Sequence, residues 1–157
     1  MPTLYPNTQG IFDKIYNLIL ALNIYTTVEE GAIKNWTNAD PVCEVMWAED
    51  DSEHFATNQK IRDPQGFRIT SGVSYTKAGI TPATAVANLI VIRDTVIPMF
   101  QQRSILTGIA GVQDSRVKPG SAKISFRNEM GGDSFIVHEF IVEVKQLYNV
   151  PMGASYQ

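Results

Sequence analysis

Apolar residues recur with helical spacing in the first part of the chain. Thr8 is placed to cap a helix, and the apolar pattern ends near residues 23–25. The stripe consists of Ile11, Phe12, Ile15, Leu18, Ile19 and Leu22. Asp13, Lys14 and Asn17 fall on the opposite side. This pattern predicts an amphipathic helix with one buried side.

A second helical pattern begins at Thr81 and Pro82, which are suited to the N-cap and the first helical position. Its stripe contains Val86, Leu89, Ile90, Arg93 and Ile97. Pro98 lacks an N–H and crowds the carbonyl four residues before it. We therefore expect a kink at Pro98, or an end of the helix at Ile97.

Alternation with a period of two, typical of half-buried strands, appears between and after the helices. It predicts strands at 42–49, 67–75, 112–117, 122–127 and 135–147. In the fourth of these, Ile124 and Phe126 are expected to point inward. The order helix-strand-strand-helix-strand-strand-strand predicts an α+β fold, with one mainly antiparallel sheet of four to five strands and two helices packed on one face.

Residues 1–147 are expected to form a single α+β domain, since 157 residues with 44% hydrophobic content suffice for one core. Residues 148–157 contain proline and glycine without periodicity, which predicts a C-terminal extension or arm. The net charge is −3, and scattered basic residues do not make the surface of a general nucleic-acid binder. A signal peptide and a membrane-spanning run are not apparent, so we expect a soluble protein made in the cytoplasm.

The candidate reactive residues do not form a recognisable set. Cys43, the single cysteine, alternates with apolar residues and is expected to be a small buried hydrophobe. His138 lies within an apolar strand, where a core or interface histidine is the better interpretation than a base. Two histidines and one cysteine far apart do not form a zinc site. We predict no catalytic residue, no metal, no cofactor and no enzyme activity.

An acidic run occupies the start of a predicted polar loop at 49–65. It contains Glu49, Asp50, Asp51 and Glu53 and is followed by His54. It lacks the ligand spacing and the glycine of a calcium loop, so a solvated acidic surface is the better interpretation. Such a surface would face a basic partner or repel DNA.

The last predicted strand is apolar on its outer face as well as its inner face. Phe135, Val137 and Ile141 lie on that outer face, and Tyr148 follows the strand. We predict a subunit interface at these four residues. A second small cluster covered by a loop explains Phe135, Val137 and Ile141 equally well.

The second helix and the element order resemble a known family. The run from Ile80-Thr81-Pro82 through Asn88-Leu89-Ile90-Val91-Ile92-Arg93-Asp94 to Ile97-Pro98-Met99-Phe100 is similar to the second helix of the tail terminator, or tail-to-head joining, proteins of long-tailed bacteriophages. The resemblance covers roughly residues 8–147 in architecture.

This resemblance implies a structural virion protein of the tail and neck, assembled in the host cytoplasm. Six copies would form a ring that caps the tail tube protein and presents a surface to the head connector or stopper. DNA would pass through the lumen without specific binding, and the acidic loop would face the lumen or a partner. Two alternatives stay open: another neck, head-closure or baseplate adaptor component, and a small ligand- or metal-binding domain that uses the acidic loop and His54.

Overall fold

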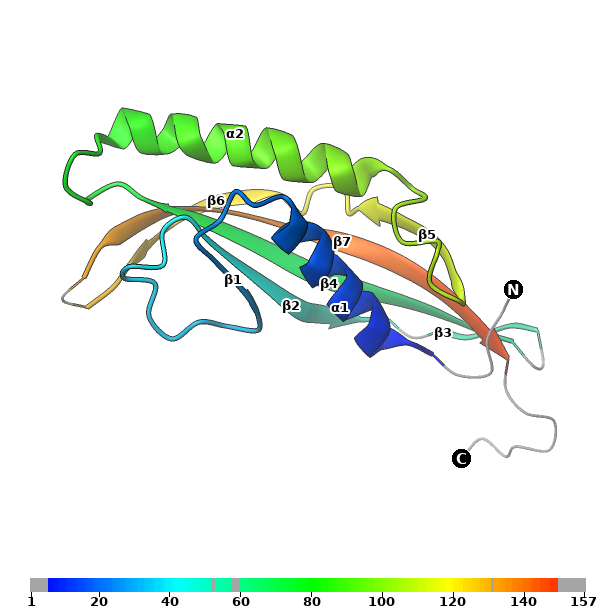
Figure 1. The fold of residues 1–157 in the computed structure, drawn as a ribbon. Coiled ribbons are helices and arrows are strands. Elements are labelled where there is room, and N and C mark those ends of the chain that lie inside the picture. The colour runs from blue at the N-terminus through cyan, green and yellow to red at the C-terminus, as the bar shows by residue number, and fades with distance from the viewer. Residues whose placement is uncertain (1–5, 52, 58–59, 131, 150–157) are drawn as a thin grey trace.

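The computed structural model describes residues 6–149 apart from 52, 58–59 and 131, and it describes 53–57 and 60 by their backbone alone. Within this part of the chain, two helices and seven strands form an α+β fold (Figure 1). The elements in order are α1 Thr8–Ala21, β1 Thr27–Glu30, β2 Val42–Asp50, β3 Glu53–Thr57, β4 Lys60–Ser74, α2 Pro82–Gln101, β5 Val112–Val117, β6 Lys123–Asn128 and β7 Ser134–Asn149.

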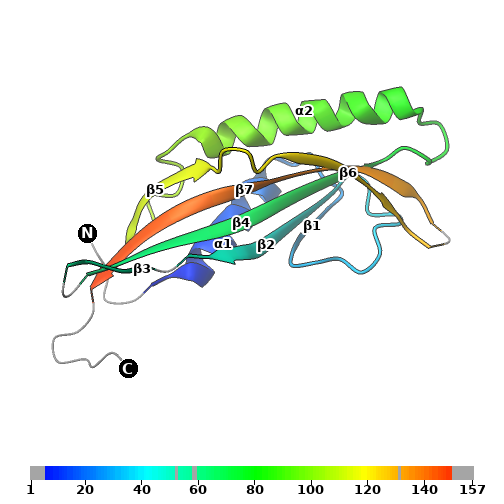
Figure 2. The ribbon, with the colours of Figure 1, turned by 180° about the vertical axis from the view of Figure 1, so that it is seen from behind.

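All described strands belong to one sheet. The path runs β1-β2-β4-β7-β5, with β3 paired to β4 and β6 paired to β7. β1 and β2 are parallel, and the other pairs are antiparallel. β4 and β7 pair from Lys60↔Asn149 to Ser74↔Phe135 and form the long curved centre of the sheet (Figure 2). The sheet is therefore mainly antiparallel, but the expected number of four to five strands was too low.

The additional strands lie where the sequence is polar. β1 has four residues, of which only Val28 is buried. The predicted loop at 49–65 is wrong, because β3 and the first half of β4 form a hairpin there. In this half of β4, Asp63 and Gln65 are buried at 4% and 3% exposure, continuing the side occupied by Phe67. Because these buried side chains are polar, this half of β4 lacks the alternation of apolar and polar residues from which strands are predicted.

One face of the sheet carries both helices. Ile11, Ile15 and Ile19 of α1 pack into the same apolar core as Leu89 and Val96 of α2. The core also contains the sheet residues Cys43, Val45, Phe67, Ile69, Val73, Ile136, Phe140, Val142 and Val144. We call this side of the sheet the helix face and the opposite side the far face. In Figure 1, α1 lies obliquely in front of the strands and α2 runs above them; in Figure 2, seen from behind, α1 lies behind the strands.

The helix ends differ in part from the sequence expectation. Asn7, not Thr8, caps α1, because its side chain accepts the Gly10 N–H at 3.2 Å. Thr81 caps α2 as predicted. An end of the helix at Ile97 is wrong, since α2 continues through Pro98 to Gln101. Pro98 lies in the last turn of α2 and is exposed.

A loop at residues 31–41 covers part of the far face and forms a second small core. Trp36, 1% exposed, meets Phe135 edge-on with ring centroids 5.4 Å apart. Val42 and Val137 pack into the same cluster. The Arg127 guanidinium lies 4.2 Å from the centre of the Trp36 ring, on the side of β6.

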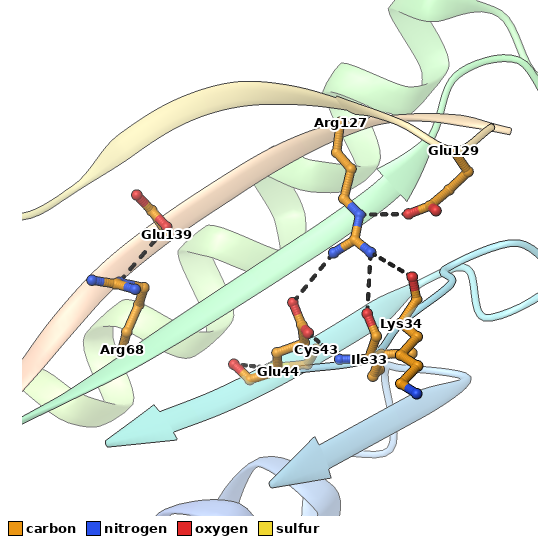
Figure 3. A network of polar contacts seen from close by, with 8 residues as sticks. All are labelled: Ile33, Lys34, Cys43, Glu44, Arg68, Arg127, Glu129 and Glu139. Carbon is orange, nitrogen blue, oxygen red and sulfur yellow. Dashed lines mark hydrogen bonds and ion pairs between the residues drawn. The ribbon is translucent and has the colours of Figure 1, made fainter. Parts of the chain in front are cut away.

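Arg127 ties this loop to the sheet through polar contacts (Figure 3). Its Nη1 lies 3.7 Å from Glu44, and its Nε lies 2.5 Å from Glu129. Its Nη2 donates to the carbonyl of Ile33 at 3.1 Å. The Ile33 N–H in turn donates to Glu44, which is 7% exposed. The buried carboxylate is thus satisfied by a cation and a backbone donor, as burial of a charge requires.

Cys43 should be unreactive in the folded protein. Its side chain is fully buried, and burial raises the pKa of the thiol to about 12. Since the thiolate is the reactive form, we expect a colorimetric thiol reagent to react only when the chain unfolds. The measurement is the absorbance change with and without denaturant, and the single cysteine assigns the signal. Rapid stoichiometric reaction without denaturant would contradict the burial of this residue.

Candidate interaction surface

An apolar groove runs between α2 and β6 on the helix face. Its volume is about 620 Å³. Val86, Leu89, Ile90, Arg93 and Asp94 line it from α2, and Ala122, Lys123, Ile124, Ile136 and His138 line it from the sheet and the residue before β6. In Figures 1 and 2, β6 follows the sheet edge below α2. We call this feature the α2–β6 groove.

The groove exists because β6 extends the sheet beyond the area that α2 covers. By register, Ile124 pairs with His138 and Phe126 with Ile136, so both side chains point to the helix face. They are nevertheless 69% and 68% exposed. The expectation that Ile124 and Phe126 point into the core is therefore wrong. Phe126 instead meets Tyr75 edge-on, with centroids 5.9 Å apart.

The helix contributes a second apolar side to the groove. Ala85, Leu89, Ile92, Val96 and Phe100 face the core. The predicted buried stripe was therefore partly misplaced, because Val86 and Ile90 are 42% and 53% exposed in the groove. Among the described residues, α2 alone is long and apolar enough to cross a membrane. The sheet covers one apolar side of α2, and the groove leaves the other open.

Polar groups lie at two places in the groove. Arg93 and Asp94 form an exposed ion pair at 2.8 Å on α2. His138 lies at the floor, 6% exposed. Burial, and secondarily the charge of Arg93, lowers the pKa of His138 below 6.5, whereas Glu139 acts in the opposite direction. The imidazole is therefore neutral at pH 7 and does not place a positive charge in the groove.

This lowered pKa predicts a pH dependence of stability. Unfolded His138 takes up a proton near pH 6.5 more readily than the folded form does, so acid favours unfolding. The contribution of His138 to the free energy of unfolding is complete above pH 6.5, and it is lost as the pH falls towards the pKa of His138 in the folded protein. We expect the thermal midpoint to fall more between about pH 7.5 and about pH 5.5 for the wild type than for His138→Gln. Equal falls would show that His138 titrates normally; His54 is present in both proteins.

The predicted interface residues on the last strand lie in different places. Phe135 and Val137 are buried under the loop at 31–41, so the structure removes the reason for assigning these two to a subunit contact. Ile141 is half-buried on the far face. Tyr148 is half-buried within β7, which extends through Asn149; residues 150–157 of the predicted arm lie outside the described residues.

The predicted acidic loop is instead made of the end of β2 and the start of β3, two strands that both pair with β4. Glu49 forms an ion pair with Lys118 at 2.8 Å. Asp50 accepts a hydrogen bond from the buried Gln65 amide at 2.8 Å, and Asp51 is exposed. The side chains of Glu53 and His54 lie outside the described part of the chain. Of the three carboxylates whose side chains the structure describes, Glu49 and Asp50 therefore have structural partners.

A smaller polar groove of about 220 Å³ opens on the far face beside this ion pair. Arg68 and Glu139 lie 3.9 Å apart there, and Lys118 and Glu49 complete two opposite-charge pairs. Lys123 also lines this groove, so its three cations and two carboxylates leave a formal excess of one positive charge. Among the side chains that the structure describes, no group of three His, Cys, Asp or Glu residues could hold a metal ion.

Comparison of the sequence with protein-family models and with curated proteins gives no match. The α2–β6 groove is thus the candidate site on its geometry alone. A signal for it was present in the sequence, because apolar residues occur on two sides of the second helix. Ile124 and Phe126 formed the other part of that signal.

Proposed function

We propose that this chain is a structural virion protein of a long-tailed bacteriophage, a tail terminator whose copies form a closed ring. The ring caps the tail tube and joins it to the head connector, and DNA passes through the lumen. The assignment to the tail terminator family rests on the resemblance of the second helix and of the element order. The α2–β6 groove supplies the physical reason for assembly.

The observation that carries the proposal is an apolar surface at one edge of the sheet with no covering element among the described residues. Of the eight large apolar side chains that are exposed among the described residues, Val86, Ile90 and Ile124 line the groove. Phe126 lies beside them, on the same face of β6 as Ile124. Exposed apolar surface gathered in one place is typical of a protein–protein contact. When one surface of a subunit contacts a different surface of the next subunit, the copies form a closed ring if the rotation that relates them closes.

Negative-stain electron microscopy of the purified protein at high concentration tests this function. We expect closed rings with a central hole wide enough for duplex DNA. Sedimentation velocity on the same sample gives the mass of the species and hence the number of copies, which the resemblance sets at six. A protein that stays monomeric in both measurements at all concentrations would contradict self-assembly into a ring.

The position in the virion separates this function from another neck, head-closure or baseplate role. Antibody labelling of intact particles should mark the head-proximal end of the tail. Labelling of the distal end would instead favour a baseplate adaptor. Either result is independent of the subunit contact argued below.

The same groove favours one alternative function, a binding site for a small apolar ligand. Its volume and apolar lining suit such a ligand. A hydrophobic dye that fluoresces in apolar sites tests this use. Dye that binds to assembled rings as well as to subunits would favour the ligand site, because a groove filled by a neighbouring subunit excludes the dye.

A further inference from the structure

The sheet has two open sides: β1 ends the strand order on one side, and β5 and β6 both pair with β7, over different parts of its length, on the other. Among the described strands, β6 pairs only with β7, and β1 pairs only with β2. An unpaired edge presents a row of backbone donors and acceptors to which another strand can be added. β1 has four residues and β6 has six. A strand of similar length from another copy could therefore pair along the whole of either one.

The strand directions are compatible with joining these edges. β1 is parallel to β2, and the steps from β2 to β4, from β4 to β7 and from β7 to β6 are each antiparallel. Three reversals leave β6 running opposite to β1. When neighbouring copies keep the same orientation about a ring axis, the β6 edge of one copy meets the β1 edge of the next in the antiparallel sense.

The charges at the two edges are complementary on the far face. Glu29 of β1 pairs with Glu44, which places it on the far face, and it is exposed. Lys123 of β6 pairs with Glu139, which places it on the same face, and it is also exposed. A junction between β1 and β6 therefore brings opposite charges to the same side of the joined sheet.

The helix face shows a second complementary feature. Glu30 of β1 lies on this face and is exposed. Arg93 lines the α2–β6 groove on the same face. Leu20 of α1, the helix that contacts β1, is 49% exposed and offers an apolar side chain to the groove.

We propose that β6 of one subunit pairs antiparallel with β1 of a second copy of this chain, so that one sheet continues from subunit to subunit. This inference rests on the ring function proposed above and assigns its subunit contact. The α2–β6 groove receives the α1 side of the β1 edge, and Lys123 faces Glu29 across the junction. Both helices of every subunit then lie on the same side of the continuous sheet.

Cysteine cross-linking tests the junction directly. Two single variants, Glu29→Cys and Ser125→Cys, are each treated with a short bismaleimide, alone and mixed; buried Cys43 stays unreactive in both. We expect covalent dimers only in the mixture, and a ladder of larger products from the double variant. Ser104→Cys, exposed in the loop between α2 and β5 and thus on the opposite side of the subunit from β1, is the matched control and should not cross-link with Ser125→Cys.

A charge exchange gives an independent measurement. Lys123→Glu and Glu29→Lys should each weaken self-association, by about threefold to tenfold for a partly exposed pair. In an equimolar mixture of the two proteins, contacts should be restored at junctions where Glu introduced at 123 meets Lys introduced at 29. A chain that carries both changes should associate like the wild type. Failure of the double variant to recover would contradict the contact between these residues.

The outcomes separate this contact from the proposed function. Dimers from Ser125→Cys alone would show a β6–β6 contact and overturn the head-to-tail junction. Closed rings in the microscope without any mixed cross-link would overturn the junction and leave the ring function standing. A cross-linked ladder from open chains or filaments without closed rings would support the junction and count against the tail-terminator function.

Discussion

Replacing Gly72 with alanine should destabilise the protein by about 1–3 kcal/mol, the range typical of overpacking in a core. Gly72 lies near the end of β4 on the far face, under the ring of Trp36. A Cβ at this position would overlap Cζ3 of Trp36 and lie 2.9 Å from its Cε3. Pairing with both β2 and β7 prevents the strand from moving away. Urea unfolding followed by fluorescence provides the measurement.

A double-mutant cycle identifies the cause of this loss. Trp36→Ala alone should cost about 3–5 kcal/mol, because it empties the second core next to Phe135. In that background Gly72→Ala should cost much less, since the ring it meets is gone. Gly108→Ala, where an added Cβ meets nothing within 4 Å, is the matched control and should change stability by no more than about 0.5 kcal/mol. An equal cost of Gly72→Ala in both backgrounds would contradict the proposed overlap.

Charges placed in the α2–β6 groove should prevent assembly without unfolding the subunit. Ile90 and Ile124 are 53% and 69% exposed, so Ile90→Glu with Ile124→Glu leaves the core intact. Both side chains lie in the groove that the partner is proposed to fill, and the acidic β1 edge would be repelled. Loss of about 2 kcal/mol at each position corresponds to roughly a thousand-fold weaker association. Sedimentation velocity measures the association, and circular dichroism measures the fold.

The matched control for these changes is Val91→Glu. Val91 is 65% exposed on the same helix but does not line the groove, so its change should leave assembly unaltered. Phe135→Asp is a comparison in which the fold of the subunit, and not only its assembly, should be affected. Because Phe135 is fully buried against Trp36, we expect this change to reduce the free energy of unfolding of the subunit itself. Wild-type assembly by the double glutamate variant would contradict the assignment of the groove.

The parts of the fold that sequence patterns predicted are those with regular apolar spacing. Ile11, Ile15 and Ile19 identified α1, and alternation from Phe67 onward identified the second half of β4. The sequence pattern failed where burial is polar, because the side chains of Asp63 and Gln65 are buried through hydrogen bonding to each other at 2.6 Å. Such a contact joins residues on the same strand and leaves no periodic apolar signal.

The candidate site was harder to predict for a different reason. Alternation places Phe135 and Ile124 on definite faces of their strands, but it does not say what covers each face. Trp36, about a hundred residues earlier, covers Phe135, whereas α2 leaves Ile124 open. Both outcomes depend on contacts between distant segments. The sequence therefore indicated that surplus apolar surface was present, and the structure is needed to locate it.

The position of β7 in the sheet has a consequence for biosynthesis. This strand lies between β4 and the pair β5 and β6, yet it is the last of the described strands to be made. While it is still inside the ribosome, β4 lacks a neighbour on one side and β6 has no strand to join. Compact folding must therefore wait for β7 to emerge, and closure of these distant contacts makes it slow. The β6 edge proposed to join subunits then forms only after β7 has been made, so a nascent chain that still lacks β7 cannot present this edge to a partner.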